Sequence, residues 1–192
     1  MKALPNYRTF TQFVTDYKVR EEGDDKFIEG YFAVFNKNYQ IWKDVTESVA
    51  PGAFAKCLND DVRALTNHDT TLVLGRTAAN TLVLREDDFG LWGRILINPN
   101  DTDAVNTYER VKRGDVSQCS FGFEILDEET EKREDGSVHY TIKAVKLYEV
   151  SVCTFPAYED TNVKARGRDI EAIKARQLDA WKEQQRKRIR GI

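Results

Sequence analysis

Short segments rich in β-branched and aromatic residues follow one another along this chain, and turn residues separate them. Four such segments are 27–35, 72–76, 81–84 and 91–97, and the sequence Asp-Asp-Phe-Gly at 87–90 suits a hairpin turn. The pattern predicts many short strands, because these side chains favour strands while Gly, Asp and Asn favour turns. A barrel or a sandwich fits it better than a doubly wound sheet.

Three more strands are expected at 116–125, 138–146 and 148–154. The highly charged stretch 127–136 predicts an exposed loop between the first two. A helix is expected over 51–58, where Pro51 suits a helix start. Another is expected over 101–113, which has capping residues at its start, a basic last turn and Gly114 as its stop.

The character of the chain changes after Pro156 and Ala157. Residues 168–190 lack Gly and Pro and predict a long helix with a thin apolar stripe. We therefore expect a mainly β body with flanking helices (an α+β fold) over 1–163 and a basic, mainly helical tail over 164–192.

Charge is distributed unevenly between these two parts. The tail carries ten Lys and Arg against four Asp and Glu, a net charge of +6, which leaves −9 on the body. An acidic body predicts that nucleic acid is not its partner. The tail either touches an acidic surface or is a solvated basic helix.

No run of ~18 apolar residues exists, so no membrane partner is expected. The first residues lack the apolar core of a signal peptide, which predicts a cytoplasmic protein. Cys57, Cys119 and Cys153 show neither a CxxC pair nor zinc-ligand spacing with His, so reduced thiols and no metal or cofactor are expected.

Three residue types that support nucleophilic catalysis occur in separate short motifs. His68 lies in Asn-His-Asp, Ser120 begins Ser-Phe-Gly-Phe, and Glu149 begins Glu-Val-Ser. A base, a nucleophile and a carboxylate spaced in this way predict a serine hydrolase whose triad assembles only in the fold. The alternatives are a turn histidine, a strand serine facing water and an exposed strand glutamate.

Strand alternation separates the candidates near residue 120. Ser120 shares a face with Gln118 and Gly122, and the glycine leaves space for a substrate backbone. Cys119 shares the opposite, core-facing side with Phe121, which argues against a Cys119 thiol hydrolase. On the later strand, Glu149 shares a face with Ser151 and Cys153, and this pattern alone does not separate an orienting carboxylate from an exposed one.

The motifs, taken in order, resemble those of the tailed-phage prohead proteases, which are related to the herpesvirus assembly protease, assemblin. The matching pieces cover about residues 27–160 and lie at 30–35, 51–54, 67–69, 74–76, 90–92, 120–123, 149–152 and 156–157.

The resemblance implies His68 as the catalytic histidine and Ser120 as the nucleophile. Glu149 is the implied third member, although assemblin uses a second histidine there, which keeps His139 as an alternative. The implied fold is a compact herpesvirus-protease-like β-barrel, here followed by a C-terminal helix, and the implied assembly is a homodimer. Gly75–Arg76 and the backbone near Gly122 are candidate oxyanion donors.

The implied function is a serine endopeptidase of procapsid maturation. It would act in the host cytoplasm inside the phage procapsid, on the scaffold, on the delta region of the major capsid protein and on itself. The basic tail would then serve as an assembly handle. The alternative is a non-catalytic capsid-assembly or scaffold protein that retains the protease fold.

Overall fold

Strands make up most of the computed structural model, which describes residues 7–12 and 18–155. The strands are β1 (Arg8–Gln12), β2 (Lys18–Glu22), β3 (Asp25–Val34), β4 (Tyr39–Trp42), β5 (Val45–Val49), β6 (Arg63–Thr66), β7 (Asp69–Arg76), β8 (Leu82–Glu86), β9 (Gly90–Leu96), β10 (Gln118–Lys132) and β11 (Val138–Cys153). One α-helix, α1 (Thr102–Arg113), and one short 3-10 helix, η1 (Thr77–Ala79), join them. The predicted mainly β fold with helical additions is confirmed.

The strands form two sheets. One has seven strands in the order β1-β10-β11-β5-β4, with β6 pairing with β11 and β7 pairing with β6. The other has four strands in the order β2-β3-β9-β8. Neither sheet closes on itself among the described residues, so the barrel that the resemblance implies is an open, two-sheet arrangement here.

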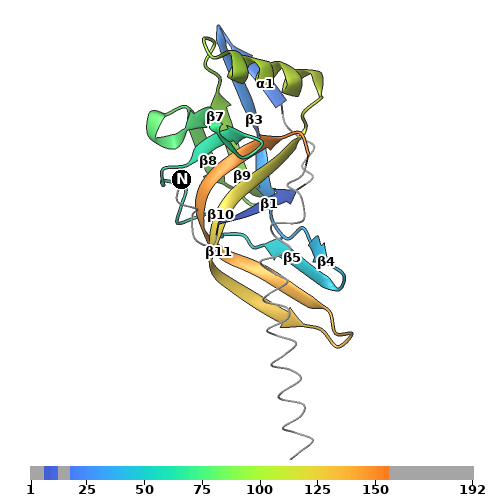
Figure 1. Ribbon diagram of the computed structural model, residues 1–192. Helices are drawn as coiled ribbons and strands as arrows, with labels where there is room; N and C mark the ends of the chain where they lie inside the picture. Colours follow the sequence, from blue (N-terminus) through green and yellow to red (C-terminus); the bar gives the residue numbers. More distant parts are fainter. Residues whose placement is uncertain (1–6, 13–17, 156–192) are drawn as a thin grey trace, which may run out of the picture. The chain divides into compact units, whose positions relative to one another are not determined.

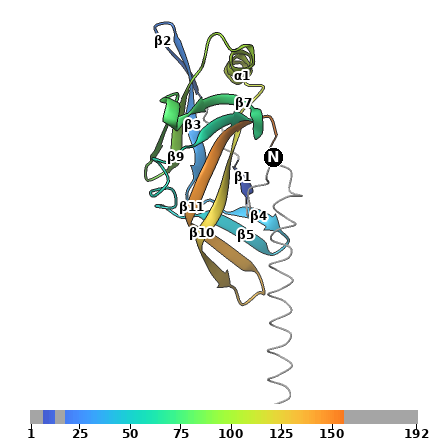
Figure 2. The same ribbon diagram turned by 60° about the vertical axis from the view of Figure 1, so that its left-hand side comes forward.

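The strands β10 and β11 are the longest in the molecule, and they pair along their whole length. They run side by side from the end near α1 to a hairpin tip beyond β4 and β5 (Figures 1 and 2). β11 is also parallel to β5 near the tip and to β6 near its C-terminal end. This central strand therefore touches three others.

Aromatic side chains fill the space between the two sheets. Phe121 packs edge-on against Phe54 and lies beside Phe123, and all three are buried. The thiol of Cys119 points the same way and donates to the carbonyl oxygen of Tyr31 at 3.1 Å. The core face of β10 is therefore the one that strand alternation predicts.

Helix α1 is confirmed with its expected boundaries. The Asp101 carboxylate accepts hydrogen bonds from the backbone amides of Asp103 and Ala104, and Gly114 ends the helix in a left-handed conformation. These are local capping interactions, which explains why short-range sequence signals are sufficient here.

The helix expected over 51–58 is wrong, because this segment is a series of turns. Gly52 adopts a positive φ of 89°, and the amide of Ala55 donates to its carbonyl only three residues back. The carboxylate of Glu86 then takes the amides of Gly52 and Phe54 at 2.6 and 2.9 Å. Hydrogen bonds that reach three residues back and the positive φ of Gly52 thus give turns in place of the helix that Pro51 suggests.

The exposed loop expected over 127–136 is also wrong. β10 continues to Lys132, and the two strands expected at 138–146 and 148–154 are the single strand β11. The turn itself occupies only the residues between β10 and β11.

The predicted tail helix, the body–tail boundary at residue 163 and the Pro-Ala motif at 156–157 lie outside the described residues. Within the described ranges, no helix is both long enough and apolar enough to cross a membrane.

Candidate active site

His68 occupies a two-residue turn between β6 and β7. Thr66 pairs with Asp69, and the two residues between them, Asn67 and His68, have φ values of 52° and 60°. Positive φ at both central positions defines the type I′ hairpin turn, which usually contains Asn followed by Gly. A histidine in the second position is strained, and such strain persists only where surrounding contacts hold it.

The face of β11 supplies those contacts. His68 Nδ1 lies 2.7 Å from Glu149 Oε1, and the His68 backbone amide donates to Ser151 Oγ at 3.2 Å. His68 Nε2 lies 3.9 Å from Cys153 Sγ. Glu149, Ser151 and Cys153 alternate along the strand, so they share the face on which the sequence placed them.

Glu149 is a buried carboxylate with three hydrogen-bond donors. His68 Nδ1 and the Tyr7 hydroxyl, at 2.8 Å, both donate to Oε1, while Ser151 Oγ donates to Oε2 at 2.5 Å. An ionised carboxylate can only accept, so Nδ1 carries the proton and Nε2 is the nitrogen left to act as a base. A buried charge needs such partners, and here they fix both oxygens.

Tyr7 is a site residue that the sequence did not predict. Burial, and then the charge of Glu149, raise the pKa of its phenol well above the ordinary value, so it stays a donor. Gly122 makes this contact possible, because a Cβ there would overlap both Tyr7 Oη and Glu149 Oε1. The space expected to admit a substrate backbone at Gly122 is therefore occupied by these two side chains.

Ser120 lies on the same face, one strand away. It pairs directly with Ser151 across β10 and β11, and Gly122 pairs with Glu149. Side chains that face each other across antiparallel strands have Cβ atoms about 4.5–5.5 Å apart. The fold thus brings His68 and Glu149 into contact and sets Ser120 beside them, with its side chain fully buried.

His139 lies elsewhere. It is on β11 near the hairpin tip, where Nδ1 lies 2.7 Å from Thr46 Oγ1 and Nε2 lies 2.9 Å from Ser48 Oγ on β5. Ten residues of extended strand separate it from Glu149, roughly 33 Å at 3.3 Å per residue. Burial lowers the pKa of His139 below its ordinary value.

The three cysteines are free thiols and all are buried. Burial raises the pKa of Cys57 to about 11 and raises that of Cys153 well above its ordinary value. Cys119 faces the core, away from His68. Among the described residues, no group of three or more His, Cys, Asp or Glu side chains is arranged to hold a metal ion.

Arg76, one of the candidate oxyanion donors, already has partners. Its backbone amide donates to Thr81 Oγ1 at 2.9 Å, and its guanidinium binds both carboxylate oxygens of Asp61. These contacts engage the Arg76 amide and the Nε and Nη2 atoms of its guanidinium.

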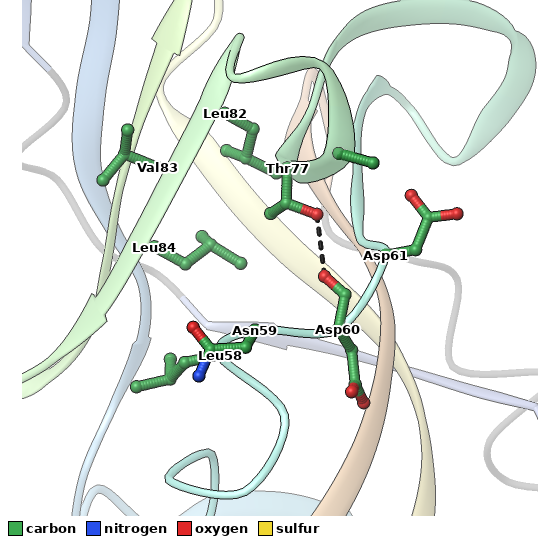
Figure 3. Close-up of a pocket in the computed structure, with 9 residues that line it drawn as sticks. Leu58, Asn59, Asp60, Asp61, Thr77, Leu82, Val83 and Leu84 are labelled. Atoms are coloured by element: carbon green, nitrogen blue, oxygen red, sulfur yellow. Dashed lines mark hydrogen bonds between the residues drawn. The ribbon is translucent and has the colours of Figure 1, made fainter.

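A hollow of about 340 Å³ lies away from these residues, between the turns that precede β6 and strand β8 (Figure 3). Its lining includes Asp60 and Thr77, and Thr77 Oγ1 donates a hydrogen bond to the carbonyl oxygen of Asp60 at 2.7 Å. None of the residues that line it belongs to the group around Glu149.

Comparison with known proteins gives three similarities. The caudovirus prohead serine protease family matches residues 15–176. The prohead protease of Enterobacteria phage HK97 is 30% identical over 172 residues, which cover 87% of this chain and 72% of the relative. The solved structure of the bacteriophage T4 capsid assembly protease is similar with a TM-score of 0.48 and 12% identity, and the match covers 78% of this chain and 96% of the T4 chain.

Proposed function

Because the chain belongs to the caudovirus prohead serine protease family, we propose that it is the endopeptidase of phage procapsid maturation and that His68, Ser120 and Glu149 form its triad. The observation that carries the proposal is the 2.7 Å contact between His68 Nδ1 and Glu149 Oε1, on the face that Ser120 shares. A carboxylate on Nδ1 leaves Nε2 unprotonated, as a general base requires.

In the proposed reaction, His68 Nε2 accepts the Ser120 proton while Oγ attacks a peptide carbonyl. Glu149 stabilises the imidazolium that forms. The imidazolium then protonates the leaving amine, and water resolves the acyl-enzyme by the same path. Ser120 is fully buried, so a substrate reaches it only after a local rearrangement.

The proposed substrates are the scaffold and the delta region of the major capsid protein, with the protease itself as a further substrate. The name of the HK97 relative, a prohead protease, supports a substrate within the prohead. The reaction would take place in the host cytoplasm inside the procapsid, in a homodimer, and it uses no metal or cofactor.

The test is co-expression with the capsid and scaffold proteins of the same phage, followed by intact-mass analysis of every product. Ser120→Ala should leave all masses at full length, whereas wild type trims its partners or itself. Ser117→Ala is the matched control, because Ser117 is exposed and only three residues away. Equal products from wild type and Ser120→Ala would overturn the proposal and favour the non-catalytic assembly protein.

A further inference from the structure

We propose that Ser151 is a positioning residue that holds the base and the carboxylate of the triad in register. The inference rests on the proposed function, because Ser151 acts only through the proposed triad residues and takes no chemical part itself. Its hydroxyl contacts His68 and Glu149 at once, through the His68 backbone amide at 3.2 Å and through Glu149 Oε2 at 2.5 Å.

The two hydrogen bonds use the hydroxyl both as a donor and as an acceptor. A serine hydroxyl has one proton to donate and lone pairs with which to accept. Ser151 donates its proton to the Glu149 carboxylate, which can only accept, and it accepts from the His68 amide, which can only donate. The side chain is fully buried, so water does not compete for either partner.

The first contact fixes the backbone of His68, from which the imidazole projects. His68 has a φ of 60° in a turn position that favours glycine. A conformation of this kind is unfavourable for a residue other than glycine and persists only where surrounding contacts hold it. The Ser151 hydroxyl binds the His68 amide in this conformation, so it stabilises the backbone from which the ring projects.

The second contact fixes the direction of the carboxylate. Ser151 holds Oε2, which leaves Oε1 to His68 and Tyr7. Without the donor on Oε2, the Glu149 side chain could rotate away from the imidazole.

Strand register adds a third relation. Ser151 pairs with Ser120 on β10 and with Leu65 on β6, so it lies between the proposed nucleophile and the hairpin that carries His68. One buried hydroxyl therefore contacts His68 and Glu149, and it belongs to the residue that pairs with Ser120. A threonine or valine would add a methyl group where the described packing leaves no exposed surface.

The experiment uses the full chain, with Ser151→Ala against Ser48→Ala. Ser48 is the matched control, because it is also buried and its hydroxyl binds the other histidine, His139. Cleavage of the capsid protein should slow by about 10- to 100-fold in Ser151→Ala and should be unchanged in Ser48→Ala.

A second readout does not depend on activity. The chain has only two histidines, so ¹⁵N-histidine labelling yields two separable sets of ring signals. The Nδ1–H proton of His68 should be lost to exchange in Ser151→Ala and retained in Ser48→Ala. A merely structural role for Ser151 would lower stability and leave this proton signal in place.

Each outcome has a distinct meaning. Cleavage by Ser120→Ala would overturn the proposed triad, whatever the result for Ser151→Ala. If Ser120→Ala is inactive while Ser151→Ala cleaves at the wild-type rate with its His68 proton intact, only the positioning role is overturned. Should Ser151→Ala not fold, Ser151→Cys keeps the volume with a weak donor, and wild-type behaviour in that variant would overturn the role equally.

Discussion

The two histidines of the chain occupy different chemical environments within the same mainly β fold. His68 binds a buried carboxylate, whereas His139 binds two hydroxyls near the hairpin tip. Their surroundings, and not their residue type, determine which of them can be a general base.

Glutamine at each histidine separates the two roles. His68→Gln should lower the cleavage rate by about 10²–10⁴-fold, because it removes the proposed proton acceptor. His139→Gln should cleave at nearly the wild-type rate and lose about 1 kcal/mol of unfolding free energy from altered hydrogen bonds. Capsid-protein cleavage and chemical denaturation measure the pair, and a reversed pattern would assign the triad to His139.

Gly122 tests the packing around the carboxylate. An alanine there would place its Cβ against Tyr7 Oη and Glu149 Oε1, and both must then move. Gly122→Ala should abolish detectable cleavage and destabilise the fold by about 1–3 kcal/mol. Gly136→Asn is the control, because that position is open and its left-handed φ suits asparagine. Full activity in Gly122→Ala would show that the Glu149 contacts are dispensable.

Part of the candidate site can be predicted from the sequence. The difference between the predicted residues and the missed ones has a physical cause. His68, Ser120 and Glu149 stand in motifs with definite strand facing, so alternation alone orients them. Tyr7 has no such signal, because its partner Glu149 lies 142 positions away. The bridging role of Ser151 depends on the pairing of β6 with β11, which no local pattern specifies.

At the scale of elements, the hairpin of β10 and β11 carries a buried titratable group toward its tip. Desolvation lowers the pKa of His139, Arg133 lowers it further, and Glu131 raises it. The folded chain therefore binds a proton at this site less readily than the unfolded chain does, whose histidine has the ordinary pKa of 6.5.

Stability should consequently fall as the pH drops below about 6.5. The unfolded state takes up the His139 proton first, so the unfolding free energy declines by at most about 1.4 kcal/mol per pH unit from this group. Denaturation between pH 7 and 5.5 should show a flatter profile for His139→Gln than for wild type. Identical slopes would mean that His139 has the same pKa in the folded and the unfolded chain.

Elements, like residues, can be predicted from the sequence where the contacts that shape them are local. Helix α1 is predictable, because Asp101 and Gly114 act within one turn of it. The charged half of β10 resembles a loop, because its strand conformation comes from pairing with β11. In the turns after Pro51, the amides of Gly52 and Phe54 bind the carboxylate of Glu86, which lies more than 30 residues away in the sequence.

At the scale of the whole molecule, the buried hydrophobic cluster of the described residues runs from Ile28 to Val152. A chain that ends at residue 163 should therefore keep its thermal midpoint within about 2 °C, since ~1 kcal/mol would move it by about 2–4 °C. It should also retain Ser120-dependent cleavage of added capsid protein but not enter procapsids, if the basic tail is the assembly handle. Calorimetry and procapsid composition measure the two effects, and normal incorporation would remove that role from the tail.

β11 pairs with β10, β5 and β6, and it follows all three in the sequence. During translation, the ribosome releases β6 with its histidine turn and β10 with its serine before the strand that joins them. The nascent chain has neither the Glu149 carboxylate nor the Ser151 hydroxyl until synthesis of the body is almost finished. Long-range pairing of this kind also forms late in folding. The proposed hydrolytic centre would therefore stay incomplete while the protein is being made.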